Sequence, residues 1–403
     1  MIGFLKNSAY SFPYIAMKKN SKAFLILLLG TMSAFGPFIM DLYLPALPQL
    51  RDYFHTSAAF TQVSLMTAMI GLGVGQLFIG PLSDKYGRKR PLLISLGVFV
   101  ITSFALVFSP NIHVLITLRA IQGFSAAGSV VLSRAVATDL YTGRELGKFF
   151  AMLMTVHGLA PVLSPVAGSY LLRFTDWQGV FVSLTLLGLV LITAVLFLVE
   201  SLPPERRFDS SIFKSFTVYP QILKNSTFMG FVLMQSFGFA GLFAYISASP
   251  FIFQSHFGLS PTEFSACFGA NGLAVMIGAN ICTRINRSHA LRFGVTVFTL
   301  ATLYLAVALI EGFSIGFIEP GFFCMTLSLG FIFPIVSMQA MSSERKNAGS
   351  ASALLGFCPF MLGAICSPLV GIGNLFVSTG IVLSITGLAV CAMYWRVRHR
   401  LTF

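Results

Sequence analysis

Charged side chains are scarce in this chain of 403 residues. Asp, Glu, Lys and Arg make up 10% of the sequence, whereas hydrophobic residues make up 56%. A soluble globular domain carries about 25% charged residues, so a water-facing surface cannot be built from this composition. Acidic residues are the scarcest group, with 13 Asp and Glu against 26 Lys and Arg. The composition excludes an ordinary soluble protein and indicates a chain that lies in lipid.

Several motifs that mark enzymes and ATP-driven pumps are also missing. The sequence has no phosphate-binding loop, no Cys/His metal-ligand spacing and no Ser-His-Asp arrangement. Its six cysteines fall in apolar segments of the second half and form no Cys-x-x-Cys pair, which favours a packing role. We therefore expect no enzyme, no metal site and no cofactor.

Long apolar runs are the dominant feature that is present. Each run of about 20 residues is long enough to cross a bilayer core of about 30 Å as a helix. Helices are expected because lipid offers no hydrogen-bond partner to the backbone, and the alternating segments of a β-barrel are not seen. The predicted spans are 23–44, 60–82, 91–109, 113–134, 147–171, 178–199, 226–250, 263–283, 292–310, 318–340, 348–371 and 374–395.

The basic residues are distributed unevenly among the predicted loops. The net charge of +13 alone would suggest a nucleic-acid partner. However, 23 of the 26 Lys and Arg residues fall on the side of the termini, Arg51 and Arg173 fall on the other side, and Arg119 lies within a span. This bias over short loops is the positive-inside rule, so both termini are predicted in the cytoplasm and no nucleic acid is expected.

The order of spans and polar segments predicts two halves. The longest interior polar stretch follows six spans and precedes six more. The predicted organisation is a cytoplasmic tail at 1–22, a six-helix bundle at 23–199, a cytoplasmic linker at 200–225, a second six-helix bundle at 226–395 and a cytoplasmic tail at 396–403.

Sequence repeats support a relation between the halves. The pattern Ser-Pro-x-x-Gly occurs at 164–168 and again at 367–371, an offset of 203 residues. A glycine nine residues before a proline occurs at Gly36 and Pro45, and again at Gly241 and Pro250. Matches at similar offsets in corresponding spans predict parallel repeats, and in such a design the ligand site lies between the halves near the middle of the membrane.

Three motifs in the first half resemble those of a known family. The loop 80–90 has the spacing Gly-x-Leu-x-Asp-x-x-Gly-Arg-Lys, which closely resembles the signature loop of the major facilitator superfamily. The run Arg119-x-x-Gln122-Gly123 resembles the fourth-helix motif of that family. The segment 40–48, Met-Asp-Leu-Tyr-Leu-Pro-Ala-Leu-Pro, is similar to the bicyclomycin/chloramphenicol-resistance (Bcr/CflA) branch of drug:proton antiporters.

A fourth motif matches in part. Pro161, Ser164, Pro165 and Gly168 stand in a segment that resembles the antiporter motif Gly-Pro-x-x-Gly-Gly of drug exporters. Here Ser164 and Ser169 occupy positions where glycine is usual. The partial match leaves the transported compound and the direction of transport open.

The resemblance implies a fold, a location and a mechanism. The implied fold is an all-α membrane protein of twelve helices in two bundles, monomeric and in the bacterial cytoplasmic (inner) membrane. The implied activity is proton-coupled efflux of drug-like small molecules by alternating access. The implied conformational switch comprises Gly80, Asp84, Gly87, Arg88, Lys89 and Asp139, with Asp84 near 347–349 and Arg88 paired with Asp139.

Two charged residues within spans are candidates for proton coupling. Asp41 lies near the outer end of the first span, and Arg119 lies about 10 Å from the same face in the fourth. Charges are costly at such depth, so they are presumed functional. If the two spans are neighbours, Arg119 favours the charged form of Asp41 and desolvation opposes it, so cargo entry would change the proton affinity.

Aromatic and polar residues on the spans that line the cavity in the family are candidates for cargo contact. They are Phe35, Phe38, Tyr43, Gln122, His157, Phe237, Tyr245, Phe331 and Phe357. Such a cavity would suit bulky amphipathic compounds.

Two alternatives to proton-coupled drug efflux remain open at this stage. One keeps the fold but makes the chain an importer, or an exporter of one cellular metabolite such as a siderophore. The other is a membrane receptor or enzyme without transport, which no catalytic constellation supports. The expected partners are a small-molecule substrate, protons and the lipid bilayer.

Overall fold

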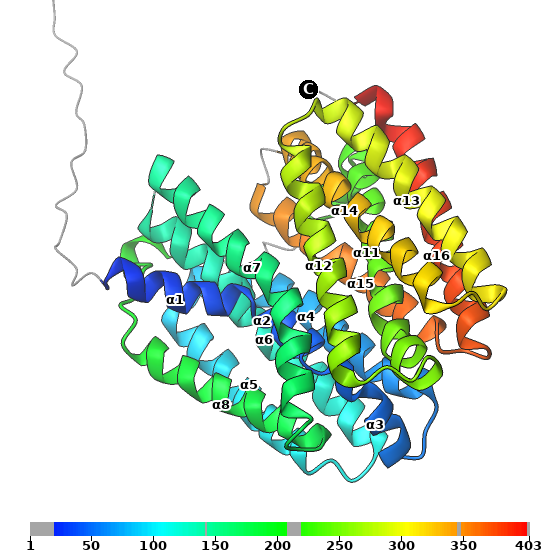
Figure 1. Ribbon diagram of the computed structural model, residues 1–403. Coiled ribbons are helices and arrows are strands. Elements are labelled where there is room, and N and C mark those ends of the chain that lie inside the picture. Colours follow the sequence, from blue (N-terminus) through cyan, green and yellow to red (C-terminus); the bar gives the residue numbers. More distant parts are fainter. Residues whose placement is uncertain (1–19, 142, 208–218, 345–347, 401–403) are drawn as a thin grey trace, which may run out of the picture.

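A computed structural model describes residues 20–141, 143–207, 219–344 and 348–400, and all regular elements in these ranges are helical (Figure 1). The first half comprises α1 (Lys22–Ser33), α2 (Phe35–Asp41), η1 (Leu44–Ala46), α3 (Leu47–Tyr53), α4 (Ala58–Tyr86), α5 (Lys89–Val107), α6 (Ile112–Leu140), α7 (Gly143–Leu171) and α8 (Trp177–Leu196). The second comprises η2 (Pro204–Arg206), α10 (Tyr219–Lys224), α11 (Ser226–Pro250), η3 (Phe251–His256), α12 (Pro261–Cys282), α13 (Arg287–Ile310), α14 (Ile315–Ser343), α15 (Ala348–Leu369), α16 (Leu375–Val397) and η5 (Arg398–Arg400).

Most of these helices are apolar enough to cross a membrane. Within the described ranges, ten helices pass by length and composition, and α1 with the segment Phe35–Tyr53 adds an eleventh as a broken span bent by 42°. In α7 the apolar part is the shorter stretch Leu159–Leu171. The all-helical prediction is therefore confirmed, whereas the number of twelve spans stays a prediction.

Helix starts follow local sequence signals. The Ser57 side chain accepts a hydrogen bond from Phe60 N at the start of α4, and Asn111 does the same for Val114 N at α6. At α12, Ser260 and Glu263 form a reciprocal capping box. These side chains satisfy backbone N–H groups that have no partner within the helix. The caps explain why α4 and α12 begin two residues before the predicted spans.

The helices pack in two groups that meet along two interfaces. Helices α1–α8 pack mainly on one another, as do α11–α16, while α4 lies against α15 and α7 against α12 (Figure 1). The repeats share a feature of geometry as well, because η1 and η3 interrupt regular α-helix near Pro45 and Pro250. Corresponding helices therefore form the interface. With α1 and α2 counted as one helix, α4 and α7 are the second and fifth long helices of the first group, and α12 and α15 are the second and fifth of the second group.

Glycines set the closest packing inside each group. A Cβ atom at Gly123 of α6 would lie 2.0 Å from Ala68 O of α4, and one at Gly71 would lie 2.2 Å from Ala120 O. In the second group, Cβ atoms at Gly278 and Gly330 would meet backbone oxygens of α14 and α12 at 2.2 Å. Small residues allow helices to approach this closely in a membrane.

Polar contacts join the two groups at one end of the bundle. We call the end that carries Arg88, Lys89 and Arg90 the basic end. At the opposite end, Gln62 Nε2 donates to Ser247 O at 2.9 Å, and Ser265 Oγ donates to Pro165 O at 2.9 Å. In Figure 1 the two groups converge near α3, at this opposite end, and diverge toward the basic end.

Candidate functional site

Asp41 lies at the end of α2, beside the interface between the two helix groups. Its side chain is buried, with 5% exposed. Within the described residues, no hydrogen bond or ion pair involves its carboxylate. The neighbouring backbone is tightly packed, because a Cβ atom at Gly168 of α7 would lie 2.2 Å from Leu42 O. Asp41 is thus a buried carboxyl group without a hydrogen-bond or ion-pair partner, and it lies beside a close contact between the end of α2 and α7.

Arg119 of α6 is fully buried and binds the backbone of α2. Its guanidinium donates to Ile39 O at 3.0 Å and to Gln122 Oε1 at 2.6 Å. Gln122 Nε2 in turn donates to Ser103 Oγ of α5 at 2.8 Å. Arg119 forms no ion pair with Asp41 in this structure, which corrects the expected pairing. Its Nη1 and Nη2 groups donate to an amide and to a carbonyl instead, and its buried Nε has no hydrogen-bond partner.

Aromatic rings cover the Arg119 guanidinium. Its Cζ atom lies 4.7 Å from the ring centroid of Tyr43 and 5.9 Å from that of Phe181. The Tyr43 hydroxyl is hydrogen-bonded to Ser64 Oγ at 2.9 Å. A cation over aromatic faces is stabilised without a counter-charge. Arg119, Gln122 and Tyr43 therefore form one rigid cluster inside the first helix group.

The basic end contains a second charged cluster, at the α4–α5 turn. Arg88 Nε donates to Asp139 Oδ2 at 2.8 Å, and Arg88 Nη1 donates to Asp84 Oδ1 at 2.6 Å. The expected pairing of Arg88 with Asp139 is therefore present. Burial lowers the pKa of the Arg88 guanidinium, but the hydrogen bonds and charges of Asp139 and Asp84 outweigh burial and bring that pKa above its usual value.

Glu200 completes this cluster and was not predicted from the sequence. Its carboxylate accepts hydrogen bonds from the backbone N–H groups of Arg88 at 2.9 Å and Lys89 at 3.1 Å. Gly87 stands at a φ of +87°, and a Cβ atom there would lie 2.7 Å from Glu200 Oε2. The sequence offered two separate signals: an acidic residue directly after the sixth predicted span and, more than 100 residues before it, a glycine turn that exposes backbone N–H groups.

The remaining predicted switch residues have simpler surroundings. Gly80 lies within α4, where a Cβ atom would approach Val131 of α6 at 3.8 Å. The Asp84 side chain is 52% exposed and bonds Arg88. The expected approach of Asp84 to 347–349 lies outside the described residues, since residue 347 and the side chains at 348 and 349 are not described.

The antiporter-like motif lies on α7 where the two groups meet. Ser164 and Pro165 are buried, Pro161 is half-buried, and both prolines lie inside the helix. Pro165 O accepts the hydrogen bond from Ser265 across the interface. The Ser164 hydroxyl is buried without a hydrogen-bond partner. This segment therefore contacts α2 through Gly168 and α12 through Pro165.

The predicted cargo residues lie in different surroundings. Phe35 and Phe331 are buried and pack against Phe99 and Phe293 of their own helix groups, with ring centroids 4.6 and 5.2 Å apart. Tyr43 and Gln122 belong to the Arg119 cluster. The half-buried residues are Phe38, Phe237 and Phe357, and Phe357 lies against Gly73 of α4. The side chain of His157 lies outside the described residues.

A carboxyl group in the second helix group was missed by the sequence reasoning. Glu319 of α14 accepts a hydrogen bond from Asn271 Nδ2 at 2.8 Å, and the same amide nitrogen donates to the Tyr245 hydroxyl at 2.9 Å. Glu319 was placed at the edge of the predicted span 318–340. The structure begins α14 at Ile315 and brings Glu319, which is half-buried, to the middle of α12.

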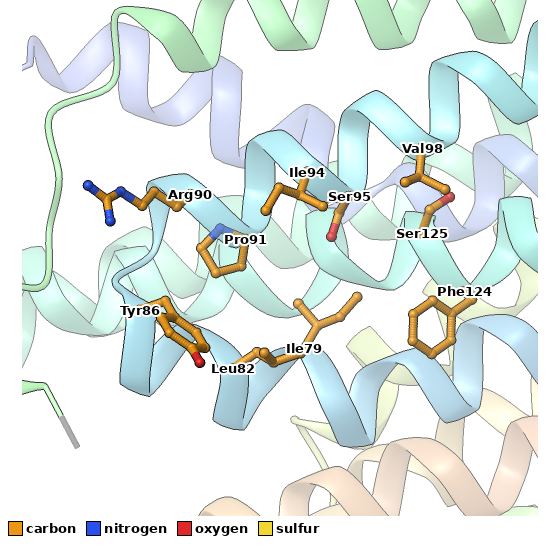
Figure 2. A pocket seen from close by; sticks show the side chains of 10 residues that line it. All are labelled: Ile79, Leu82, Tyr86, Arg90, Pro91, Ile94, Ser95, Val98, Phe124 and Ser125. Carbon is orange, nitrogen blue, oxygen red and sulfur yellow. The ribbon is translucent and has the colours of Figure 1, made fainter. Parts of the chain in front are cut away.

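A pocket of about 420 Å³ lies between α4, α5 and α6 of the first group (Figure 2). Its lining is mainly apolar and comprises Ile79, Leu82, Tyr86, Arg90, Pro91, Ile94, Ser95, Val98, Phe124 and Ser125. None of the predicted site residues is among them. This pocket is separate from Asp41 and Glu319.

Comparison with known proteins identifies relatives of this arrangement. The sequence model of the Major Facilitator Superfamily matches residues 26–368. An uncharacterized MFS-type transporter of Bacillus subtilis, YdgK, is 40% identical over 358 residues, which cover 87% of this chain and 89% of the relative. A bicyclomycin resistance protein homolog of Haemophilus influenzae is 28% identical over 365 residues, which cover 88% of this chain and 90% of the relative.

A solved structure shows the same fold. The xylose transporter XylE from E. coli, in a partially occluded inward-open conformation, matches with a TM-score of 0.73 at 12% identity. The match covers 93% of this chain and 97% of that chain. At this identity the likeness concerns the fold.

Proposed function

Because this chain belongs to the major facilitator superfamily, in the branch that includes bicyclomycin-resistance proteins, we propose that it exports drug-like or amphipathic small molecules in exchange for protons. Family membership makes it a transporter of small molecules and not an enzyme.

The unpaired carboxyl group of Asp41 is the observation that carries the proposal. An ionised carboxylate is costly to bury when no counter-charge or hydrogen-bond donor meets it. Asp41 has neither, so seclusion from water favours its protonated form. Entry of water or of a cationic cargo lowers the cost of the charge and favours proton release. One carboxyl group can therefore bind a proton in one conformation and lose it in another.

Arg119 supports this function by a different route from the one first expected. It holds the backbone of α2 through Ile39 O, two residues before Asp41. This bond keeps the carboxyl group at a defined place beside α7 while no permanent positive charge pairs with it. We therefore assign Arg119 a positioning role and Asp41 the proton-carrying role.

The distribution of contacts supports alternating access. Hydrogen bonds from Gln62 and Ser265 join the groups at the end opposite the basic loops. If these bonds break while the α4–α5 turn approaches the second group, the bundle opens at the end where the bonds were and closes at the basic end. A membrane potential supplies about 2.3 kcal/mol per charge per 100 mV for this cycle.

The proposed topology follows from the same reading. We assign α7 as a further membrane span, which brings the total to twelve, because its 29 residues reach about 44 Å as a helix. With an even number of spans, both termini and the linker 200–225 lie in the cytoplasm, and the bundles 23–199 and 226–395 are the moving units. The location is the cytoplasmic membrane of a bacterium, and the unit is a monomer.

One feature favours a second candidate, the export of a single metabolite or import. Ser164 and Ser169 replace the glycines of the drug exporter motif, and the Ser164 hydroxyl is buried without a partner. A hydroxyl in this position offers a hydrogen bond to a polar cargo, which a glycine does not. Inverted vesicles with an acidic interior accumulate the cargo if the chain is an exporter.

The test is the variant Asp41→Asn in an efflux-deficient bacterial host. A panel of dyes and antibiotics, including bicyclomycin and chloramphenicol, is measured for tolerance and for uptake into inverted vesicles. We expect the variant to fold and to lose gradient-driven transport, because the amide occupies the same space and cannot exchange a proton. Asp52→Asn is the matched control, since that side chain is 67% exposed and bonds Arg51.

The outcome separates the possibilities. Full gradient-driven efflux by Asp41→Asn refutes the proton-carrying role. Loss of transport in both variants indicates a general defect and contradicts a specific role for Asp41.

A further inference from the structure

The second helix group contains a polar cluster that the function described above does not use. Asn271 of α12 donates one hydrogen bond to Glu319 Oε1 at 2.8 Å and one to the Tyr245 hydroxyl at 2.9 Å. Its own carbonyl oxygen lies 3.4 Å from Thr326 Oγ1, a weak hydrogen bond. The Tyr245 ring is packed between Phe268 and Phe322, with centroids 5.6 and 4.6 Å away. Three helices, α11, α12 and α14, therefore hold this cluster in place.

Glu319 has few means of keeping a negative charge at this place. Its Oε2 atom is buried and has no hydrogen-bond partner, and no Lys or Arg among the described residues forms an ion pair with it. The titratable groups around it are uncharged when protonated. They are Tyr245 on α11, Cys267 on α12 and Tyr304 on α13, whose hydroxyl donates to Phe317 O of α14. A buried carboxylate oxygen without a donor favours the protonated form of the group.

The cluster lies on helices that pack beside the segment of Asp41 in the other helix group. The short helix η1 begins three residues after Asp41 and contacts α11 and α12, which carry Tyr245 and Asn271. Because Asn271 donates to the Tyr245 oxygen, the Tyr245 hydroxyl proton is left for another acceptor, and no described residue accepts it. The hydroxyl can turn toward whichever neighbour carries a negative charge.

We propose that Glu319 is a second proton-binding carboxyl group, coupled to Asp41 through Tyr245 and Asn271. This inference rests on the proposed proton exchange at Asp41 and extends it to the second helix group. Binding forms an O–H bond at Glu319 with a proton from water, and release returns that proton to water. Two carboxylates that repel each other titrate as a pair, so ionisation of one favours protonation of the other.

A structural role for Glu319 makes a different prediction. In that case its carboxylate merely joins α14 to α12 through Asn271, and its protonation does not change over the working range of pH. The bond to Asn271 by itself does not distinguish the two roles, because a glutamine oxygen would accept it equally well. Proton binding by Glu319 must therefore be measured directly.

Infrared spectroscopy of the purified full chain in lipid measures protonated carboxyl groups without any cargo. Difference spectra are recorded as pH is changed for the original chain, Glu319→Gln and Asp41→Asn. Glu311→Gln is the control, because Glu311 is exposed and follows α13. We expect Glu319→Gln to remove one titrating carboxyl band and Asp41→Asn to move the midpoint of that band to lower pH.

The variant Tyr245→Phe tests the connection, and we expect it to reduce the shift caused by Asp41→Asn. If the spectra of Glu319→Gln and the original chain have the same pH dependence, the second site is refuted. If the Glu319 band titrates but does not respond to Asp41→Asn, the coupling is refuted. A failure of the proposed function is read from transport and not from the spectra, because Asp41→Asn would then transport normally whether or not the Glu319 band titrates.

Discussion

The two helix groups solve the problem of a buried charge in opposite ways. In the first group, the Arg119 guanidinium donates to a backbone carbonyl and to Gln122, and aromatic rings cover it. In the second group, the Glu319 carboxylate accepts one hydrogen bond from Asn271 and leaves one oxygen without a partner. The cation has two of its three nitrogens hydrogen-bonded and its faces covered by aromatic rings, although its Nε has no partner. The carboxyl group is satisfied better when it binds a proton.

This difference indicates a division of labour between the buried guanidinium and the buried carboxyl groups. Arg119 keeps its charge under all working conditions because a guanidinium does not deprotonate in proteins. It can therefore serve as a fixed support for α2 and Asp41. A carboxyl group can change its charge, so the groups that exchange protons are expected to be Asp41 and Glu319.

The largest expected effect comes from removing the fixed charge. Arg119→Leu leaves Ile39 O and Gln122 without their donor in a buried site, so we expect a loss of stability of about 1–3 kcal/mol for each of these two acceptors. Glu319→Gln should change stability much less, because the amide oxygen can still accept from Asn271. Thermal unfolding of both purified variants in the same detergent measures this contrast. Equal destabilisation by the two changes would remove the distinction between a fixed and a labile site.

A smaller effect is expected from a substitution of Gly168 in α7, which packs closely against Leu42 at the end of α2. The Cβ atom of Gly168→Ala would lie 2.2 Å from Leu42 O, so α7 must move away, at a cost of about 1–3 kcal/mol. Gly97→Ala in α5 is the matched control, since a Cβ atom there meets nothing within 4 Å. We expect Gly168→Ala to reduce transport and Gly97→Ala to leave it unchanged. Normal transport and stability in Gly168→Ala would show that the α2–α7 contact is not required.

The smallest of these effects is expected at the basic end. Arg88→Lys keeps the charge but loses the planar group that bonds Asp139 and Asp84 together, at a cost of about 1 kcal/mol. Transport should fall severalfold, because the α4–α5 turn then holds its shape less firmly. Uptake into inverted vesicles measures it, with Lys85→Arg as the control for an exchange of basic residues in the same turn. Unchanged transport in Arg88→Lys would contradict a role for these paired bonds.

The sequence led directly to much of the fold because its signals are local. Apolar runs, caps such as Ser57, and the uneven distribution of Lys and Arg depend on neighbouring residues along the chain. The pairing of Arg88 with Asp139, which are 51 residues apart in the chain, was expected only from the family that the loop 80–90 resembles. Glu200 was missed because its bonds to the α4–α5 turn join segments more than 100 residues apart.

The site shows the limit of this reasoning. Asp41 and Arg119 were found because each is a lone charge in an apolar run, but their expected pairing was wrong for this structure. Whether a guanidinium meets a carboxylate or a carbonyl depends on helix rotation, which spacing along one helix does not determine. The same holds for Phe35 and Phe331, which pack within their own groups.

By itself, the sequence determined that this chain lies in a membrane, is helical, carries repeats and belongs among the transporters that its motifs resemble. These properties follow from composition and local order. Only the tertiary structure decided that Arg119 binds Ile39 O, that Asp41 is unpaired and that Glu319 meets Asn271 and Tyr245. The physical reason is that the free energy of a buried charge depends on the atoms within a few ångströms of it, and those atoms come from distant parts of the chain.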